Sequence, residues 1–382
     1  MKGGWRIFGV LLFLLLIAGC DPIVTTFEDG GDVVMYEAAD IIPTFAIPSE
    51  GIDEILVMTW NIRFGAARIP WFGDGCGDRV ILSDDEVEEG LQGIADKINS
   101  VQPDILLLQE VDVLSKRSSY EDEVQWLLDN TYLNYGVYAT IWQSQFIPSH
   151  GLGRMDMGNA ILSRWPIVDA ERIPLALRGD QDALTQYFYL QRNILKAEID
   201  GPFPTPDNLY AINIHATAFS TDDTKLKHLE KFKEVVDEID EEGSYFVAGG
   251  DMNEVPSGAA KLDYCIENAC EGESFHTDAD GGPHREGSYF LYFADENEWL
   301  DPIDESYVPA IPREDYLSNE AAYFTHGAES DSTDENYDWN RKLDFLWTNL
   351  QWFADSDSTH QDGRELSDHA AVSCRLNLGM NP

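Results

Sequence analysis

Several apolar stretches of this 382-residue sequence end in side chains that can bind a metal ion or transfer a proton. Carboxylates, amides and imidazoles at the ends of neighbouring strands can meet at one edge of a sheet. Any one of them alone would more often be a solvated residue or a cap, but together they favour metal-assisted hydrolysis. These residues are Asn61 after ILVMTW, Glu110 after ILLLQ, His215 after LYAINI, Asp251 and Asn253 in FVAGGDMN, Asp344 in KLDFLW, and Asp368 and His369 in LSDHAAV.

The elements that must position these residues follow an alternating pattern of strands and helices. Ser83 and Glu86 have capping-box spacing, and the apolar residues after them predict an amphipathic helix over 83–101. A shorter helix is expected over 121–130 and a long one over 222–242, where Gly243 suits the C-terminal cap. A mixed sheet arrangement covered by helices is therefore expected. The predicted strands are 55–62, 105–110, 136–142, 158–165, 186–199, 209–217, 245–252, 342–347 and 370–376.

The ordered set of motifs resembles the endonuclease/exonuclease/phosphatase superfamily over residues 55 to 378, approximately. That superfamily includes secreted DNases, abasic-site endonucleases, bacterial sphingomyelinases and inositol-phosphate phosphatases. The resemblance implies an α/β fold, a four-layered α/β sandwich with two packed mixed β-sheets flanked by helices. The matching segments are Asn61, LLLQEV, GNAILSRWPI, INIHAT, AGGDMNEVP, KLDFLW and LSDHAAV.

The resemblance also implies a Mg²⁺ site, with Mn²⁺ as an alternative ion. Asn61 and Glu110 would be ligands, because Mg²⁺ prefers oxygen and needs only one or two carboxylates beside its waters. Asp368 would reach the metal directly or through water. Asp251 resembles the family residue that orients or deprotonates the attacking water, and Asn253 would help to hold metal or phosphate.

Two histidines complete the implied catalytic set. His369 would face the scissile phosphate, with its imidazole oriented by Asp344. His215 would donate a hydrogen bond to a nonbridging phosphate oxygen and so stabilise the charge that develops in the transition state. Asn159 in GNAILSR is a further candidate, and support of the strand turn is its equal alternative.

The N-terminus predicts export. Lys2 and Arg6 precede the apolar run 7–19, which has the length of a signal-peptide core and is too short for a stable membrane span. The sequence LIAGC resembles a bacterial lipobox, which implies cleavage of residues 1–19 and a lipid on Cys20. We therefore expect an exported protein, anchored by its lipid to a bacterial membrane, in the periplasm or at the cell surface.

The remaining chain is expected to form one catalytic domain. Residues 20–52 are acidic and are interpreted as a tether, although part of them could pack as an extended lead-in. The endonuclease/exonuclease/phosphatase domain is expected over 53–382. Within it, 257–340 is a loop-rich insert that precedes the last strands.

The charge of the chain is strongly negative. Asp and Glu number 70 against 25 Lys and Arg, which gives a net charge of −45. Such a surface repels polyanions, favours a soluble monomer and suits a salty medium. Long duplex DNA is therefore a less favourable substrate.

Cysteine usage leaves the pairing open. After removal of the signal, Cys76, Cys265, Cys270 and Cys374 could form two disulfides or remain buried thiols. Cys265 with Cys270, and Cys76 with Cys374, is one of the three connectivities. A zinc site is not expected, because neither a CxxC pair nor an HExxH motif occurs.

The sequence therefore predicts a metal-dependent hydrolase of phosphate esters, in first place a nuclease-like phosphodiesterase. A lipid phosphodiesterase and a phosphomonoesterase are alternatives, so the substrate is a nucleic acid, a phospholipid headgroup or a related ester. A noncatalytic binding lipoprotein that retains the fold is the rival from another class. Trp71 and Phe72 could touch a membrane or pack in a loop. A local positive floor in the cleft would favour a nuclease, and its candidates are Arg63, Arg68, Arg79, Arg154 and Arg164.

Overall fold

The computed structural model describes residues 24–27, 31, 33–42, 52–72, 77–203, 208–218, 220–260, 275–277, 283–285, 298–327 and 339–379. The predicted signal peptide, Cys20, Cys76, Cys265 and Cys270 lie outside these residues. In the described part of the chain, no helix combines the length and the apolar character that a membrane span requires.

The first sheet is eight-stranded and mixed. Strands β2 and β3 are parallel, whereas the other pairings are antiparallel. The strands, in order across the sheet, are β1 (Val34–Glu37), β4 (Tyr135–Ile147), β5 (Gly153–Ser163), β3 (Ile105–Asp112), β2 (Glu54–Asn61), β16 (Val372–Asn377) and β14 (Gln351–Trp352), and β15 (Ser358–Thr359) also pairs with β16.

The second sheet is six-stranded and also mixed. Strands β8 and β9 are parallel, and their neighbours are antiparallel. Its order is β12 (Val308–Pro309), β13 (Asp344–Thr348), β9 (Tyr245–Asp251), β8 (Leu209–His215), β7 (Asn193–Ile199) and β6 (Ile167–Pro174). A separate hairpin consists of β10 (Phe275–Thr277) and β11 (Pro283–Arg285).

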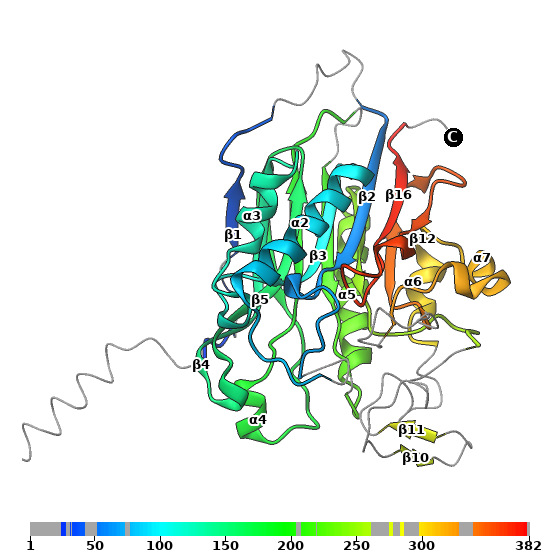
Figure 1. The fold of residues 1–382 in the computed structure, drawn as a ribbon. Coiled ribbons are helices and arrows are strands. Elements are labelled where there is room, and N and C mark those ends of the chain that lie inside the picture. Colours follow the sequence, from blue (N-terminus) through cyan, green and yellow to red (C-terminus); the bar gives the residue numbers. More distant parts are fainter. Residues whose placement is uncertain are drawn as a thin grey trace, which may run out of the picture.

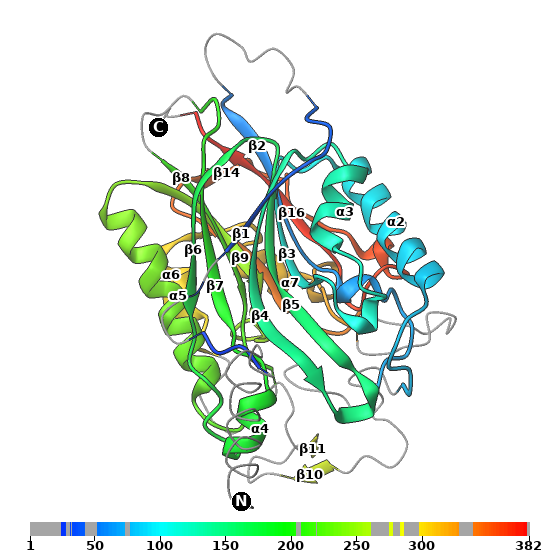
Figure 2. The same ribbon diagram turned by 90° about the vertical axis from the view of Figure 1, so that its left-hand side faces the viewer.

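Helices cover the outer faces of both sheets (Figures 1 and 2). Helices α2 (Asp84–Val101) and α3 (Glu123–Asn130) lie on the first sheet, and α5 (Thr224–Glu241) and α6 (Asp301–Ser306) lie on the second. Two further short helices are α4 (Ala183–Phe188) and α7 (Arg313–Ser318). The 3₁₀ turns are Arg63–Gly65, Lys116–Ser118, Ser149–Gly151, Glu320–Ala322 and Gln361–Gly363.

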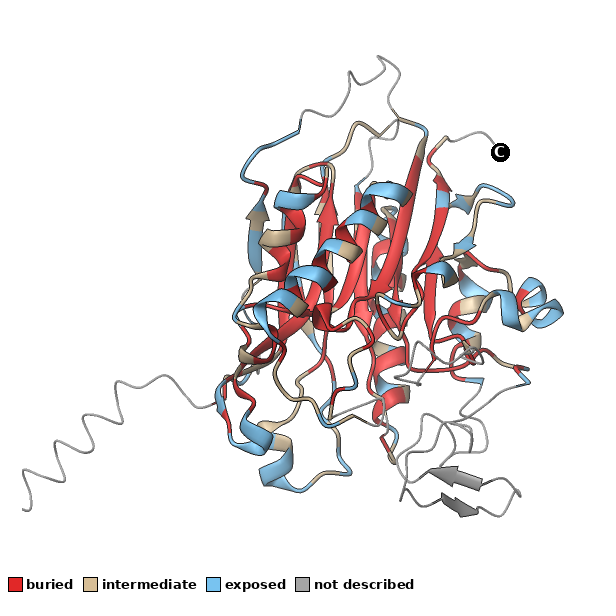
Figure 3. Ribbon diagram, in the orientation of Figure 1, coloured by how far each residue is buried: buried red, intermediate tan, exposed pale blue. Residues whose placement is uncertain are grey.

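Alternation along the central strands builds the layers. On β2, Ile55 and Val57 point into the core between the sheets, whereas Met58 and Trp60 point toward α2 and α3. Successive side chains of a strand face opposite sides, so a strand buried on both faces reads as one continuous apolar run. Figure 3 shows the strands buried and the outward faces of the helices exposed. The predicted four-layered α/β sandwich is confirmed.

The predicted helix caps explain where two of these helices begin and end. The Ser83 side chain accepts a hydrogen bond from the Glu86 backbone N–H, and the Glu86 carboxylate accepts one from Ser83, so the predicted capping box is present. Gly243, just after α5, has a φ of 78°, the left-handed conformation that glycine adopts at little cost. Both helices match their predicted ranges.

The predicted strand over 186–199 is wrong in its first half. Its beginning is occupied by α4, because the Asp182 carboxylate accepts hydrogen bonds from the backbone N–H groups of Leu184 and Thr185 at 2.9 and 3.1 Å. Asp182 therefore provides a helix cap that overrides the β-propensity of the aromatic residues that follow. Only Asn193–Ile199 forms the strand.

Part of the predicted tether packs against the domain. Strand β1 pairs with β4 along the edge of the first sheet, and Val24 bridges to Ser144 further along β4. These residues are extended and paired with the domain, whereas the rest of 20–52 lies mostly outside the described residues. The insert over 257–340 is also more than loop, since it contributes α6, α7 and β12.

Cys374 is a buried free thiol on β16. Its sulfur lies 3.3 Å from the Ser356 hydroxyl. For Cys374 the buried-thiol alternative therefore holds in this structure.

Candidate active site

The topology gathers the predicted residues at one end of the sandwich. His215 and Asp251 end the parallel strands β8 and β9 and are direct neighbours in the sheet register. Asp344 begins β13 and lies opposite Asp251 on its other side. Asn61 ends β2 in the first sheet, which faces these strands. Both sheets therefore supply residues to one site.

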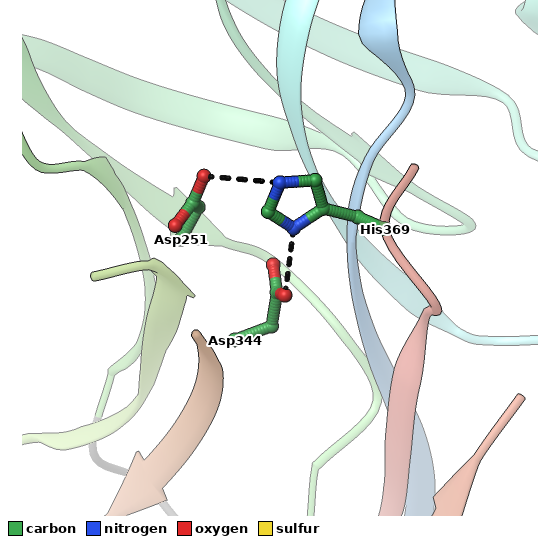
Figure 4. Close-up of side chains that lie close together, drawn as sticks. All are labelled: Asp251, Asp344 and His369. Atoms are coloured by element: carbon green, nitrogen blue, oxygen red, sulfur yellow. Dashed lines mark hydrogen bonds and ion pairs between the residues drawn. The ribbon is translucent and has the colours of Figure 1, made fainter. Parts of the chain in front are cut away.

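Asp251, His369 and Asp344 form its centre (Figure 4). The Nδ1 atom of His369 lies 2.8 Å from an Asp344 oxygen, and its Nε2 atom lies 3.7 Å from Asp251 Oδ2. The backbone of His369 is also fixed, because its carbonyl accepts a hydrogen bond from Trp60 Nε1 at 2.9 Å. The Asp344 carboxylate thus orients the imidazole, as predicted from the resemblance.

The two central groups have shifted pKa values. Burial raises the pKa of Asp251 to about 7, and Asp344 adds to this rise while His369 opposes it. Burial lowers the pKa of His369, but the carboxylates of Asp344 and Asp251 outweigh it and raise this pKa to about 10. The imidazole therefore carries a proton near neutral pH, and Asp251 can exchange one.

Asn61 connects the two sheets at the site. Its Nδ2 atom donates to Glu110 Oε1 at 3.1 Å and to Asp251 Oδ2 at 3.2 Å. Its own oxygen accepts a hydrogen bond from the Arg63 backbone N–H at 3.1 Å. The Nδ2 side of the amide therefore faces the two carboxylates, and its oxygen faces the Arg63 backbone.

Glu110 reaches the site through a bulge. The register between β3 and β5 shifts between Leu108 and Val111, and Glu110 has a φ of 55°. Bulges re-aim side chains next to active sites. As a result, the Glu110 side chain remains 25% exposed, whereas its neighbours on β3 are buried.

His215 contributes an uncharged imidazole. Its Nε2 atom lies 3.3 Å from Asp251 Oδ2 and 3.9 Å from Glu110 Oε1. Burial, together with the positive charge of Arg192, holds the pKa of His215 well below its usual value. Arg192 donates to the His215 carbonyl at 3.0 Å. A neutral imidazole can donate one hydrogen bond to a substrate without carrying a charge.

Asn253 supports Asp251. Its backbone N–H donates to Asp251 Oδ1 at 2.9 Å, and its side-chain amide donates to the Ala216 carbonyl at 3.0 Å. Asn253 has a φ of 48°, a conformation that asparagine tolerates better than most residues. The residue therefore fixes the loop that follows β9.

Asp368 lies beside Arg63. Arg63 Nε is 3.4 Å from Asp368 Oδ2, and the Ser367 hydroxyl donates to the other oxygen at 3.3 Å. Burial would raise the pKa of Asp368, but the charges of Arg63 and His369 outweigh it and lower this pKa overall. The carboxylate stays ionised and its side chain is 18% exposed. Its predicted role as a metal ligand stays a prediction.

Sequence reasoning missed the segment 325–327, which joins the parts of the site. The Thr325 hydroxyl accepts from the Asp344 backbone N–H at 3.1 Å, and its carbonyl accepts from Ala370 N at 2.6 Å. The buried His326 ring meets the His369 ring edge to face, with centroids 4.7 Å apart. Gly327 N donates to the Asp368 carbonyl. No periodic pattern marks this segment in the sequence. Its one signal is the Thr325-His326 pair, which precedes the KLDFLW motif that begins at Lys342.

The predicted positive floor is only partly correct. Arg63 and Arg68 lie by the site, where Arg68 donates to the Gly327 and Ser367 carbonyls. The other candidates are elsewhere: Arg79 pairs with Glu86, Arg154 donates to Leu114 O and Arg164 pairs with Asp104.

Two arginines that were not candidates also belong to the surroundings of the site. Arg192 lies beneath His215, and Arg341 is bridged to His326. Both are buried. These buried arginines therefore stabilise the backbone around the site and do not line an open groove.

Two other candidates prove to be packing residues. Trp71 is 9% exposed and packs against Phe64 and Phe72, with ring centroids 5.3 and 4.5 Å away. Asn159 is buried, and its amide donates to the Asn193 carbonyl at 3.3 Å, which links the two sheets. For Trp71 the packing alternative is therefore correct, and Asn159 supports the structure.

A known protein family matches the part of the chain that carries this site. The model of the Endonuclease/Exonuclease/phosphatase family matches residues 58–369, which include every predicted site residue. The chain belongs to this family. Its members are phosphoesterases that use divalent metals. Among curated proteins, none matched the sequence.

Two solved structures share the fold. One is an endonuclease/exonuclease/phosphatase from Beutenbergia cavernae DSM 12333, at 17% identity and a TM-score of 0.54, covering 86% of this chain and 72% of that chain. The other is a family protein from Leptotrichia buccalis C-1013-b, at 13% identity and a TM-score of 0.51, covering 84% and 99%. At these identities the likeness concerns the fold alone.

The donor set of the site fits a hard divalent cation. Glu110 and Asp251 both accept from the same Asn61 amide, and carboxylate oxygens of Asp251 and Asp344 lie within 4.8 Å of each other. Burial of several carboxylates together is costly unless a cation balances them, and the raised pKa of Asp251 reflects this cost. Oxygen-rich surroundings favour Mg²⁺ or Mn²⁺ over softer ions.

Proposed function

We propose that this protein is a Mg²⁺-dependent phosphodiesterase, with Mn²⁺ as an alternative ion. The observation that carries the proposal is the position of Asp251. Its carboxylate lies within 3.2 to 3.7 Å of Asn61 Nδ2, His215 Nε2 and His369 Nε2. A base surrounded by donors of this kind can activate water while the donors hold a phosphate.

The residues of the chain divide the work. Glu110 and Asn61, with Asp368 as a further ligand, would hold the metal, which when bound supplies a Lewis acid that polarises a phosphoryl oxygen. Asp251 accepts the proton of the attacking water. The His369 imidazolium, oriented by Asp344, donates to the phosphate. His215 donates from its Nε2 atom to a nonbridging oxygen, and Asn253 keeps Asp251 in place.

The surroundings favour a small or surface-bound diester over long duplex DNA. The arginines near the site are buried and support the backbone, and the chain carries a net charge of −45. Extended nucleic acid would require exposed positive charge along a groove. A nuclease acting on short strands stays the first candidate, and a phospholipid headgroup diester is the second.

We also propose that the protein is an exported lipoprotein with its lipid on Cys20. The support is the LIAGC sequence after a basic and then apolar leader. The lipid would anchor the enzyme to a bacterial membrane, in the periplasm or at the cell surface.

Hydrolysis of bis-p-nitrophenyl phosphate, with p-nitrophenyl phosphate alongside, tests the activity. We expect diester cleavage that requires Mg²⁺ or Mn²⁺, is stopped by EDTA and falls by about 100-fold or more in Asp251→Ala and His369→Ala. His360→Gln is the matched control, because this half-buried histidine contacts Ser373 away from the site. Cleavage of the monoester alone would indicate a phosphatase. No metal-dependent cleavage, in a protein that folds, would favour the noncatalytic lipoprotein.

A further inference from the structure

The N-terminal segment is fixed to the domain close to the lipobox cysteine. Val24 is 2% exposed and bridges to Ser144, and Thr25 N donates to the Gln143 carbonyl at 3.0 Å. Gln191 then clamps the segment from the other side, because its Nε2 atom donates to Thr25 O at 2.9 Å. Val24, the first residue that the structure describes, is thus a fixed point of the domain, and we call it the exit point.

This exit point lies at the active-site end of the sandwich. Strands β3 and β4 both run antiparallel to β5, so they point the same way. Gly158 of β5 pairs with Val111 of β3, next to Glu110, and with Thr140 of β4. Ser144 lies further along β4, beyond the level of Glu110. In Figure 1 this part of β4 lies at the lower end, near α4.

Exposed apolar side chains gather near this end. Phe146 follows Ser144 on β4 and is 58% exposed, and Leu184 and Tyr187 on α4 are 70% and 41% exposed. Helix α4 is held to β4, because Trp142 Nε1 donates to the Phe188 carbonyl at 2.8 Å. We call Phe146, Leu184 and Tyr187 the exit face.

We infer that the exit face contacts the surface of a lipid bilayer. The inference rests on the proposed lipid at Cys20. Cys20 precedes Val24 by four residues, which span at most about 14 Å when fully extended. A lipid inserted at Cys20 therefore brings the exit face to the membrane, and apolar side chains at an interface bury their surface there.

The partner that fits is a zwitterionic bilayer. With a net charge of −45, the chain is repelled by anionic lipid headgroups at moderate ionic strength. Contact through apolar side chains does not need opposite charge. With the exit face on the membrane, the active-site end of the domain faces the bilayer. Substrates at the bilayer surface are therefore closer to the active site than substrates in solution.

Depth-dependent quenching tests the inference on the full lipidated protein in phosphatidylcholine vesicles. An environment-sensitive fluorophore replaces Leu184 or, as a matched control, Leu317 on α7, which is 41% exposed. Brominated phosphatidylcholine should quench the fluorophore at position 184 and shift its emission to the blue, with neither effect at 317. Equal quenching at both positions, or none at 184, would overturn the inference.

A second variant separates contact from simple proximity. With the fluorophore in place of Phe146, the substitutions Leu184→Asp and Tyr187→Asp should reduce its quenching by brominated lipid. Quenching that is unchanged would show that the apolar side chains do not make the contact. Intact mass reports separately whether Cys20 carries a lipid, and a protein without it contradicts the anchor and this inference. Diester cleavage by the same sample reports on the proposed activity independently of both.

Discussion

At the scale of single residues, the site depends on how Asp344 holds His369. The carboxylate accepts from Nδ1 at 2.8 Å, and Thr325 fixes the Asp344 backbone from the other side. An imidazole that is held in this way keeps its second nitrogen directed toward Asp251. Loss of the negative charge would leave the ring in place but lower its pKa.

Asp344→Asn should therefore reduce kcat more than it changes KM. We expect a fall in kcat of about 100-fold or more, because the imidazole loses its proton affinity and with it the positive charge that it presents to the phosphate. Steady-state hydrolysis of bis-p-nitrophenyl phosphate measures the effect. Asp237→Asn is the control, because Asp237 pairs with Lys233 on α5, and this substitution should leave kcat unchanged. An equal loss in both variants would argue against the assigned role.

His326 offers a second test at this scale, since its ring packs edge to face on His369. We expect His326→Ala to lower kcat by about fivefold, because a ring contact of about 1 kcal/mol no longer restricts the imidazole. His326→Phe keeps an aromatic ring and should recover most of the activity. If phenylalanine were no better than alanine, packing would not be the function of His326.

At the scale of elements, the capping box at α2 makes a prediction about stability and pH. The Glu86 carboxylate binds Arg79 and the Ser83 N–H, and these contacts lower its pKa from 4.5 to about 2. A lowered pKa means that the carboxylate stabilises the fold above the unfolded pKa, and that this contribution is lost as the pH falls from about 4.5 toward 2.

Glu86→Ala should cost about 1 kcal/mol of unfolding free energy at pH 7 and much less at pH 2.5. Urea denaturation of both proteins at the two pH values provides the measurement. Glu89→Ala, on the exposed side of the same helix, is the control for loss of an acidic side chain. A cost that does not change with pH would contradict the carboxylate's role.

The elements also show which features can be predicted from sequence. The continuous apolar run before Asn61 and the Ser83–Glu86 spacing specify β2 and α2 through local chemistry alone. Tyr187 and Phe188 have equally strong β-propensity, yet a cap at Asp182 places them in α4. Propensity of this kind is weak enough for one local hydrogen-bonding residue to reverse it.

The same contrast holds for the site. Asp251, His215 and Asn61 could be predicted, because each is a polar residue at the end of an apolar strand. The bulge that turns Glu110 outward depends on β5, which lies distant in sequence, so no local pattern reveals it. His326 was missed because its partners, Arg341 and His369, are brought to it only by the tertiary fold.

At the scale of the whole molecule, polar side chains link the two sheets beneath the site. Gln109 on β3 donates to Asn213 Oδ1 on β8 at 2.7 Å. Asn213 in turn donates to the carbonyls of Leu108 and Ala160, both at 2.8 Å. Because the two sheets supply different parts of the site, this network also sets how the parts meet.

Asn213→Leu should destabilise the protein by about 2 to 4 kcal/mol, because Gln109 loses its shortest acceptor and two buried carbonyls lose the side-chain amide that donates to them. Chemical denaturation measures the loss, and Asn130→Ala, on an exposed helix end, should change stability by less than about 0.5 kcal/mol. Activity below the unfolding transition should fall as well, because the sheets hold different catalytic residues. Unchanged stability would show that the network is dispensable.

The last strand that the structure describes, β16, pairs with β2, the first interior strand of the first sheet along the chain. His369 stands just before β16, and its carbonyl binds Trp60 on β2. A chain that is still being synthesised therefore lacks the imidazole, and the first sheet lacks an interior strand. A partial chain that stops before residue 369 therefore cannot complete the site, so activity appears only once the segment that carries His369 has joined the sheet.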